Sequence, residues 1–136
     1  MQKNQCSTIM RAVPTFLSLA IKLAQANHEP KWRLAAVAVS GGRVLSVGIN
    51  CFQQNSSPPG TIHYQDLGRH AETEALRRCS TVPRTMYVAR VNKKNISKLA
   101  RSCDACYNTM ARLGVRQIIY TTDTGYSKEK LWTNNS

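Results

Sequence analysis

The chain has 136 residues, of which 42% are hydrophobic and 19% are charged. This length suits one domain, over residues 1–136, that buries a core without disulfides. The composition excludes a disordered chain and an integral membrane protein. The 19 Lys and Arg residues outnumber the 7 Asp and Glu residues, so the formal net charge is +12. This excess predicts attraction to polyanions, phosphorylated small molecules or anionic surfaces.

The cysteines and the apolar runs indicate the compartment. Five cysteines are an odd number, which fits a reducing compartment with some thiols committed to a metal better than a disulfide scaffold. No apolar run approaches the roughly 20 residues that span a bilayer. We therefore expect a cytoplasmic protein without a membrane partner.

The first predicted element is a helix in the N-terminal segment. Its apolar residues recur at helical spacing, which predicts a stripe that packs on a sheet. The stripe consists of Ile9, Val13, Phe16, Leu17, Ala20 and Ala24. A secretory signal is the alternative, because basic residues precede the apolar stretch and Ala24-Gln25-Ala26 resembles a cleavage site. Pro14 and Lys22 interrupt the stretch, so we favour the helix.

Strands and helices then alternate along the chain. The apolar runs 34–39 and 44–49 predict two strands joined by a hairpin at Gly41-Gly42. The elements expected after them are a long loop at 51–69, a helix from about 70 to 79, a strand at 85–91, a polar linker at 92–101, a helix from about 103 to 113 that ends at Gly114, and a strand at 115–122. This order predicts an α/β domain.

Three metal-ligand candidates lie where the two later helices begin. Cys103 and Cys106 are roughly 60° apart on one helical face, so both sulfurs can bind one ion. His70 can supply a third ligand from the preceding helix. A helix N-terminus favours the thiolate that a metal requires. Three protein ligands leave one position of a tetrahedral zinc open, which is typical of a catalytic site.

Glu72 follows His70 by two residues and can face that open position without binding the metal. A carboxylate there can take a proton from water activated by zinc and deliver it to a leaving group. This His-x-Glu pattern with a downstream Cys-x-x-Cys is typical of the zinc nucleobase deaminases.

On these motifs the sequence resembles the cytidine and deoxycytidylate deaminase superfamily, from the first helix to Thr122. His70-Ala71-Glu72 matches the branch with deoxycytidylate, polynucleotide cytidine and tRNA adenosine deaminases. The phrases at 87–91 and 101–103 resemble viral and phage members. The resemblance implies a three-layer α-β-α cytidine deaminase-like fold with a mixed central sheet. It also implies a homo-oligomer, located in the host cytoplasm for a viral member.

The resemblance assigns roles to individual residues. It implies that Zn2+ is held by His70, Cys103 and Cys106, and that Glu72 shuttles the proton. The substrate-binding set is Asn50, which would contact the sugar, the backbone of Ala71, which would meet the base, and Ser102. Asn50 is equally explained as a turn residue at a strand end. Relatives generally have proline where Ser102 stands, so the serine loosens the helix start without removing a ligand.

Other readings of the cysteines and of the chain end are weaker or narrower. Cys103 and Cys106 alone would be a weak redox signal, and His-x-Glu upstream favours the zinc. Cys79 lies about 180° around the helix from His70 and is expected in the core. A second metal site would use the residues Cys6, Cys51, His28 and His63, whose spacing matches no compact motif. The fuller relatives have a further helix and strand after Thr122, so we expect an abbreviated C-terminus.

Between Glu74 and Asp104 the chain has no acidic residue. The basic residues in this stretch are Arg77, Arg78, Arg84, Arg90, Lys93, Lys94, Lys98 and Arg101. They form either a solvated surface, a site for one 5′-phosphate, or a track for a single strand whose base enters the pocket. The aromatic candidates for stacking on a base are Phe52, Tyr64, Tyr107, Tyr120 and Tyr126, which could equally be core residues.

The predicted function is that of a hydrolase in nucleotide metabolism. It would convert cytosine to uracil in a deoxycytidylate-type nucleotide or in single-stranded nucleic acid, and release ammonia. Adenosine in RNA or tRNA is the alternative substrate, because the same site attacks C6 of adenine. A non-catalytic zinc-containing nucleic-acid-binding protein is the alternative of another class. Glu72 argues against it, because a structural zinc site has no use for an uncoordinated carboxylate.

Overall fold

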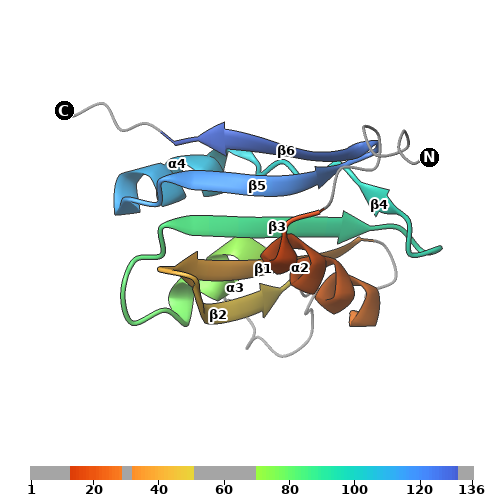
Figure 1. Cartoon of the computed structure of the whole chain (residues 1–136), viewed down its shortest axis with the longest axis horizontal. Helices are drawn as coiled ribbons and strands as arrows, with labels where there is room; N and C mark the ends of the chain where they lie inside the picture. The colour runs from red at the N-terminus through yellow and green to blue at the C-terminus, as the bar shows by residue number, and fades with distance from the viewer. Residues whose placement is uncertain (1–12, 29–31, 51–69, 132–136) are drawn as a thin grey trace, which may run out of the picture.

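The computed structural model describes residues 13–28, 32–50 and 70–131. The elements in chain order are α2 (Thr15–Ala26), β1 (Arg33–Ser40), β2 (Arg43–Ile49), α3 (Ala71–Arg77), β3 (Thr85–Val91), β4 (Ser97–Lys98), α4 (Asp104–Leu113), β5 (Gln117–Thr122) and β6 (Gly125–Lys130). The strands form one sheet of order β2-β1-β3-β5-β6, and β4 pairs with β3 off this path (Figure 1). β3 and β5 are parallel, whereas the other described pairs are antiparallel, so the sheet is mixed as predicted.

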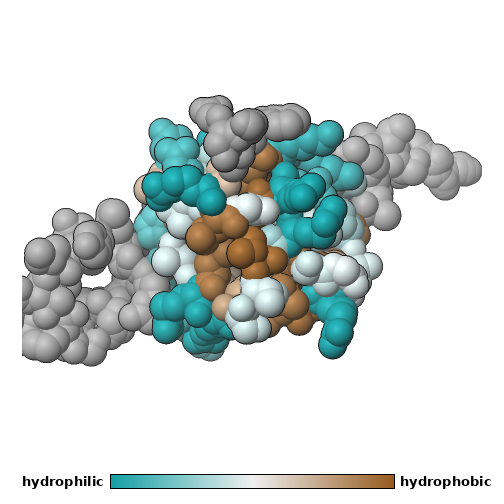
Figure 2. Space-filling view, turned by 90° about the vertical axis from the view of Figure 1, so that its left-hand side faces the viewer, coloured by the Kyte–Doolittle hydropathy of each residue, from teal (hydrophilic) through white to brown (hydrophobic). Residues whose placement is uncertain are grey.

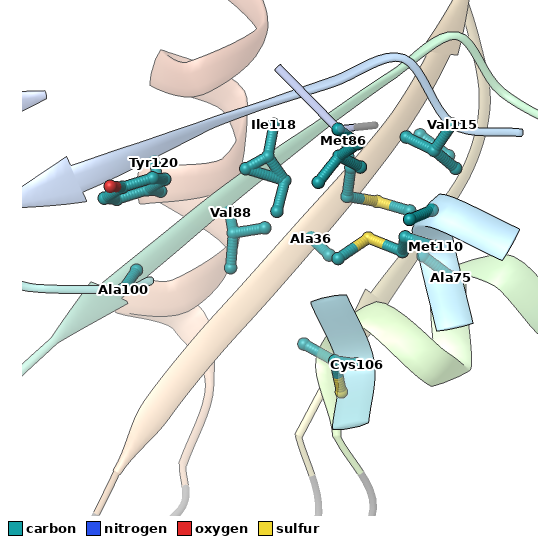
Figure 3. Packing of buried hydrophobic residues seen from close by; sticks show 14 residues of the cluster. Ala36, Ala75, Met86, Val88, Ala100, Cys106, Met110, Val115, Ile118 and Tyr120 are labelled. Atoms are coloured by element: carbon teal, nitrogen blue, oxygen red, sulfur yellow. The ribbon is translucent and has the colours of Figure 1, made fainter. Parts of the chain in front are cut away.

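Helices cover both faces of the sheet. Along β1, Ala36 and Ala38 join the apolar cluster of α3 and α4, whereas Ala35 and Val37 join the cluster of α2. This alternation follows from the period of two in a strand, and both neighbours of β1 are strands. Figure 3 shows the first cluster, where Met110 of α4 meets the sheet. The predicted α/β class with three layers is confirmed.

The N-terminal helix is an integral layer of the domain. Leu17, Ala20 and Ala24 are fully buried on β1 and β3, in the stripe that the sequence predicts. Val13 precedes the helix and is 39% exposed, and Ile9 lies outside the described residues. Within the described ranges no helix has the length and apolar character needed to cross a membrane.

α3 lies unusually close to β2 at Gly48. A Cβ on this glycine would come within 2.5 Å of the Ala71 carbonyl oxygen and 2.5 Å of the Ala75 nitrogen. Only glycine allows this approach without a shift of the helix. The Ser46 hydroxyl adds a hydrogen bond of 2.6 Å to the Ala75 carbonyl. Together these contacts hold α3 close against β2.

Two predicted turns are confirmed and two strands were not anticipated. Gly41 and Gly42 have φ angles of 59° and 76° in the β1–β2 hairpin, and Gly114 ends α4 with φ 106°. β4 lies inside the expected polar linker, where the Asn92 side chain accepts hydrogen bonds from two backbone N–H groups of the turn. β6 pairs with β5 in the segment expected to be abbreviated. Both strands are short or polar, and neither has an apolar pattern that would reveal it.

The two ends of the sheet differ. Figure 2 looks at the end on the left of Figure 1, where hydrophobic side chains gather between hydrophilic ones. Exposed apolar side chains of this end include Val82, which precedes β3, and Leu113, which ends α4. The starts of α3 and α4 belong to the opposite end, because Gly48 near the end of β2 touches Ala71, and Ala100 bonds to Thr121 at the end of β5.

Candidate active site

The candidate site forms where α3 and α4 begin. His70 is the residue before α3, with an extended backbone (φ −80°, ψ 143°), and Cys103 precedes α4 in a similar conformation. Cys106 lies in the first turn of α4 and is buried, whereas Cys103 is exposed. The two helix starts therefore bring together residues that are more than 30 positions apart in the sequence.

The three candidate ligands form one compact group. The Nδ1 atom of His70 is 3.2 Å from the Cys106 sulfur and 3.8 Å from the Cys103 sulfur. All three ligand atoms lie within 4.8 Å of one another. A tetrahedral zinc with ordinary Zn–N and Zn–S bonds separates its nitrogen and sulfur ligands by about 3.6 Å. The donor set and its spacing fit a zinc ion with these three residues as ligands.

The electrostatics of the group also fit a cation. Burial, followed by the charges of Glu72 and Cys103, raises the pKa of the Cys106 thiol far above its ordinary value. The expected lowering of this pKa by the helix start is outweighed by burial and by these negative neighbours. A thiolate at this position therefore needs a cation beside it, and a bound metal is one that deprotonates its thiol ligands.

Glu72 is buried beside the candidate ligands and bonded to Ser102. Its side chain lies in the first turn of α3 and the residue is 4% exposed. The Ser102 hydroxyl, from the residue before Cys103, donates a hydrogen bond of 2.6 Å to the Oε2 atom of Glu72. The bond connects the two helix starts a second time, and the sequence gives no signal for it because the partners are 30 residues apart.

Residues 10–122 match the family model described as the cytidine and deoxycytidylate deaminase zinc-binding region. The chain belongs to this family. No curated protein matches it. The family is zinc-binding, and the group of His70, Cys103 and Cys106 can hold a metal ion. The family match and the ligand geometry therefore both support the expected cofactor Zn2+.

Solved structures of deaminases share the fold of this chain. The dCMP deaminase of the cyanophage S-TIM5, in complex with dCMP and dUMP, superposes with a TM-score of 0.53 at 18% identity, over 90% of this chain and 85% of that one. The cytidine deaminase of Burkholderia pseudomallei gives a TM-score of 0.54 at 17% identity, over 84% and 91% of the two chains. A match to Acinetobacter baumannii RibD has 16% identity and a TM-score of 0.48. It covers 79% of this chain but only 27% of that longer chain.

The other expected substrate residues lie at the same end of the sheet. Asn50 follows β2 and is buried, and its side chain is engaged with the backbone. Its Oδ1 accepts from the Leu34 N–H and from the Asn27 amide, and its Nδ2 donates to the Trp32 carbonyl. These bonds agree with the structural interpretation of Asn50, and its contact with a sugar stays a prediction. Ala71 is the first residue of α3, and its carbonyl faces Gly48.

The remaining cysteine and histidine candidates lie apart from the site or outside the description. Cys79 contacts the Ser46 hydroxyl at 3.2 Å, beyond the far end of α3, and is partly buried against the edge of the core rather than enclosed in it. His28 is exposed after α2, and Cys6, Cys51 and His63 lie outside the described residues. The described ranges hold no second cluster of metal-ligating side chains.

The basic stretch divides into paired and unpaired charges. Arg77 and Arg78 pair with Glu74, and Arg101 pairs with Glu129. Arg90 lies over the ring of Trp32, 4.1 Å from its centre. The β3–β4 hairpin carries three lysines, Lys93, Lys94 and Lys98. In the part of the chain that the structure describes, these lysines have no ion pair.

A polar network that no sequence pattern predicts connects β6 with the loop before α4. Glu129 accepts hydrogen bonds from Arg101 at 2.8 and 3.2 Å and from the Tyr120 hydroxyl at 2.6 Å. Arg101 also lies over the ring of Tyr107, 5.2 Å from its centre. Tyr107 and Tyr120, two of the stacking candidates, therefore belong to this network. Because β6 was not predicted, no pattern in the sequence assigned a partner to Arg101.

Proposed function

We propose that this protein is a zinc-dependent hydrolytic deaminase that converts cytosine to uracil and releases ammonia. The observation that carries the proposal is the buried Glu72 carboxylate beside the group of His70, Cys103 and Cys106. These three residues would hold the zinc. A structural site would have no need of a fourth ionisable group that is not a ligand.

The chemistry that zinc supplies when bound is Lewis acidity, which activates water near neutral pH. Glu72 takes a proton from the attacking water and delivers it to the leaving amine. The water oxygen bonds to C4 of cytosine and the bond from C4 to the amine breaks, which gives uracil and ammonia. The first turn of α3 orients this carboxylate toward α4 and buries it away from bulk water. Ala71 and Asn50 would meet the base and the sugar.

For the substrate, we propose a nucleotide of the deoxycytidylate type or cytosine in single-stranded nucleic acid. The cyanophage relative holds dCMP and dUMP, and it supports the nucleotide as the first compound to test. The lysines of the β3–β4 hairpin support an anionic substrate of either kind. Adenosine in RNA is kept as a test arm because the site chemistry is the same.

The decisive experiment incubates the zinc-loaded protein with dCMP, cytidine, a cytosine-containing oligonucleotide and an adenosine-containing RNA. Ammonia release and base conversion are measured for each, with the metal-chelated protein as the control. We expect conversion of a cytosine substrate that carries phosphate, and loss of that conversion on chelation. If adenosine were the one substrate converted in a zinc-dependent way, the substrate base would be adenine and not cytosine. Absence of conversion with all four substrates would contradict the proposal.

A further inference from the structure

We propose that Ser102 is a positioning residue that holds the Glu72 carboxylate in place for proton transfer. The inference deepens the proposed function and rests on it. It replaces direct substrate binding as the role of Ser102, because the hydroxyl points to Glu72 at 2.6 Å.

Both partners of this hydrogen bond are removed from water. Ser102 is 3% exposed and Glu72 is 4% exposed. A hydrogen bond from a hydroxyl to a carboxylate is short and strong, and it is stronger still where water does not compete. The observed distance of 2.6 Å is in the range of such charge-assisted bonds.

Ser102 is the one group that fixes the carboxylate within the described residues. Glu72 receives no other hydrogen bond there. A glutamate side chain has three rotatable bonds, so a carboxylate without this donor would sample several orientations. Proton transfer requires the carboxylate within hydrogen-bond reach of the proton, and misplacement by about 1 Å is enough to slow a reaction.

The donor is itself anchored on both sides. The preceding residue, Arg101, makes two hydrogen bonds to Glu129 of β6. Ala100 donates its N–H to the Thr121 carbonyl at 2.9 Å, and Tyr107 donates its N–H to the Cys103 carbonyl at 2.8 Å. Ser102 is therefore held between the sheet and the first turn of α4. The serine that replaces the family proline supplies a donor, which proline lacks.

The test compares kcat, KM, zinc content and unfolding of Ser102→Ala with wild type. We expect kcat to fall about tenfold while KM stays within about twofold. Ser102→Thr, which keeps the hydroxyl, should restore most of kcat. Ser46→Ala is the matched control, because Ser46 also donates a 2.6 Å bond to α3, but to the backbone of Ala75. It should change stability and leave kcat at the wild-type value.

A double-mutant cycle separates positioning from any independent effect. If Ser102 acts through Glu72, the variant Glu72→Ala/Ser102→Ala should have the kcat of Glu72→Ala. The inference would be overturned if Ser102→Ala lowered kcat in the Glu72→Ala background by the same factor as in wild type. It would also be overturned by a wild-type kcat in Ser102→Ala, or by an effect of Ser102→Ala on KM alone. If Ser102→Ala does not fold, the pair Ser102→Thr and Ser102→Val makes the same comparison, since the two side chains differ by the hydroxyl.

A second readout does not depend on turnover. Wild type, Ser102→Ala, Glu72→Ala and the double variant are unfolded with denaturant in the metal-free state. We expect the losses of unfolding free energy to be non-additive, because each single variant removes the same hydrogen bond. Additive losses would overturn the inference. A wild-type protein that converts no substrate would instead contradict the proposed function, and the unfolding cycle would still decide whether Ser102 holds Glu72.

Discussion

The two faces of the central sheet are packed with different chemistry. The face under α2 buries an apolar cluster, with Leu17, Ala20 and Ala24 of the helix fully enclosed. The face under α3 and α4 buries an apolar cluster too, but its rim also encloses Glu72, Glu74 and Ser102. Burying a carboxylate opposes folding unless its hydrogen bonds are satisfied. Among the described residues, the α2 face therefore contributes mainly apolar packing, whereas the other face contributes apolar packing and also holds the candidate ligands and Glu72.

The sharpest test of this difference is removal of a candidate ligand. Purified wild-type protein should hold about one zinc per chain. Cys106→Ser should lose the zinc, the activity and part of the stability, because metal binding is coupled to folding. Zinc content by atomic absorption and thermal unfolding measure both losses.

Cys79→Ser is the control for that variant. Cys79 belongs to the same side of the sheet and contacts Ser46, away from the candidate ligands. It should keep its zinc and its activity. Full zinc retention in Cys106→Ser would refute the site.

The next largest effect is expected for the acid–base group. Glu72→Ala should lower kcat by at least ~10²-fold, the usual scale for a positioned acid–base residue, while zinc content is retained. Glu74→Ala tests a carboxylate that is equally buried in α3 but paired with Arg77 and Arg78. It should affect stability and spare kcat. Activity that survives Glu72→Ala would exclude the proton shuttle.

On the opposite face the expected result is reversed. Leu17 is fully buried against the sheet, so Leu17→Ala should lower the free energy of unfolding by about 2–5 kcal/mol. The kcat per folded molecule should stay at the wild-type value. Denaturant unfolding and activity at a temperature where the variant is folded provide the two numbers. A parallel fall in kcat would mean that the two faces are not independent.

The sequence predicted those features of the fold and the site that have a local pattern or a constrained ligand chemistry. The α2 stripe, the β1–β2 hairpin at Gly41-Gly42, the strand at 85–91 and the helix end at Gly114 all follow from local periodicity and turn chemistry. The gathering of His70, Cys103 and Cys106 was predicted because the ligand chemistry constrains it.

The unpredicted features are those with no local pattern. β6 is a polar strand at the edge of the sheet, and its pairing with β5 is a tertiary contact. The bonds from Ser102 to Glu72 and from Arg101 to Glu129 join residues about 30 positions apart. A single sequence records the residue types of such pairs but not their proximity.

A smaller effect is expected outside the buried rim, on the β3–β4 hairpin that borders the site end of the sheet. If Lys93, Lys94 and Lys98 contact phosphates of a single strand, replacing all three with Gln should flatten the log–log salt slope of binding by about 2, at roughly 0.7 per contact. Deamination of free dCMP should then stay nearly unchanged. Fluorescence anisotropy with a labelled oligonucleotide over a salt series measures the slope.

The matched control carries the same charge change to the other end of the sheet, where Arg84 and Arg116 precede β3 and β5. Gln at both of these positions and at Arg112 should leave the slope as in wild type. Oligonucleotide binding that is weak at low salt and unaffected by the lysine substitutions would exclude the polynucleotide substrate.

The smallest expected effect is the pH dependence of the network that anchors the loop before α4. Hydrogen bonds from Arg101 and then from Tyr120 lower the pKa of Glu129. A carboxylate whose pKa is lower in the folded state stabilises the fold above its unfolded pKa, and the stabilisation is lost as the pH falls through the folded pKa. The melting temperature of wild type should therefore exceed that of Glu129→Gln at neutral pH, and the difference should shrink below the ordinary pKa of glutamate. Tyr120→Phe removes the second cause and brings the folded pKa of Glu129 closer to its unfolded pKa, so the fall in stability with pH should be smaller than in wild type and should end at a higher pH. A difference between wild type and Glu129→Gln that does not change with pH would mean that Glu129 contributes by packing, and that the loop carrying Ser102 is held without this charge.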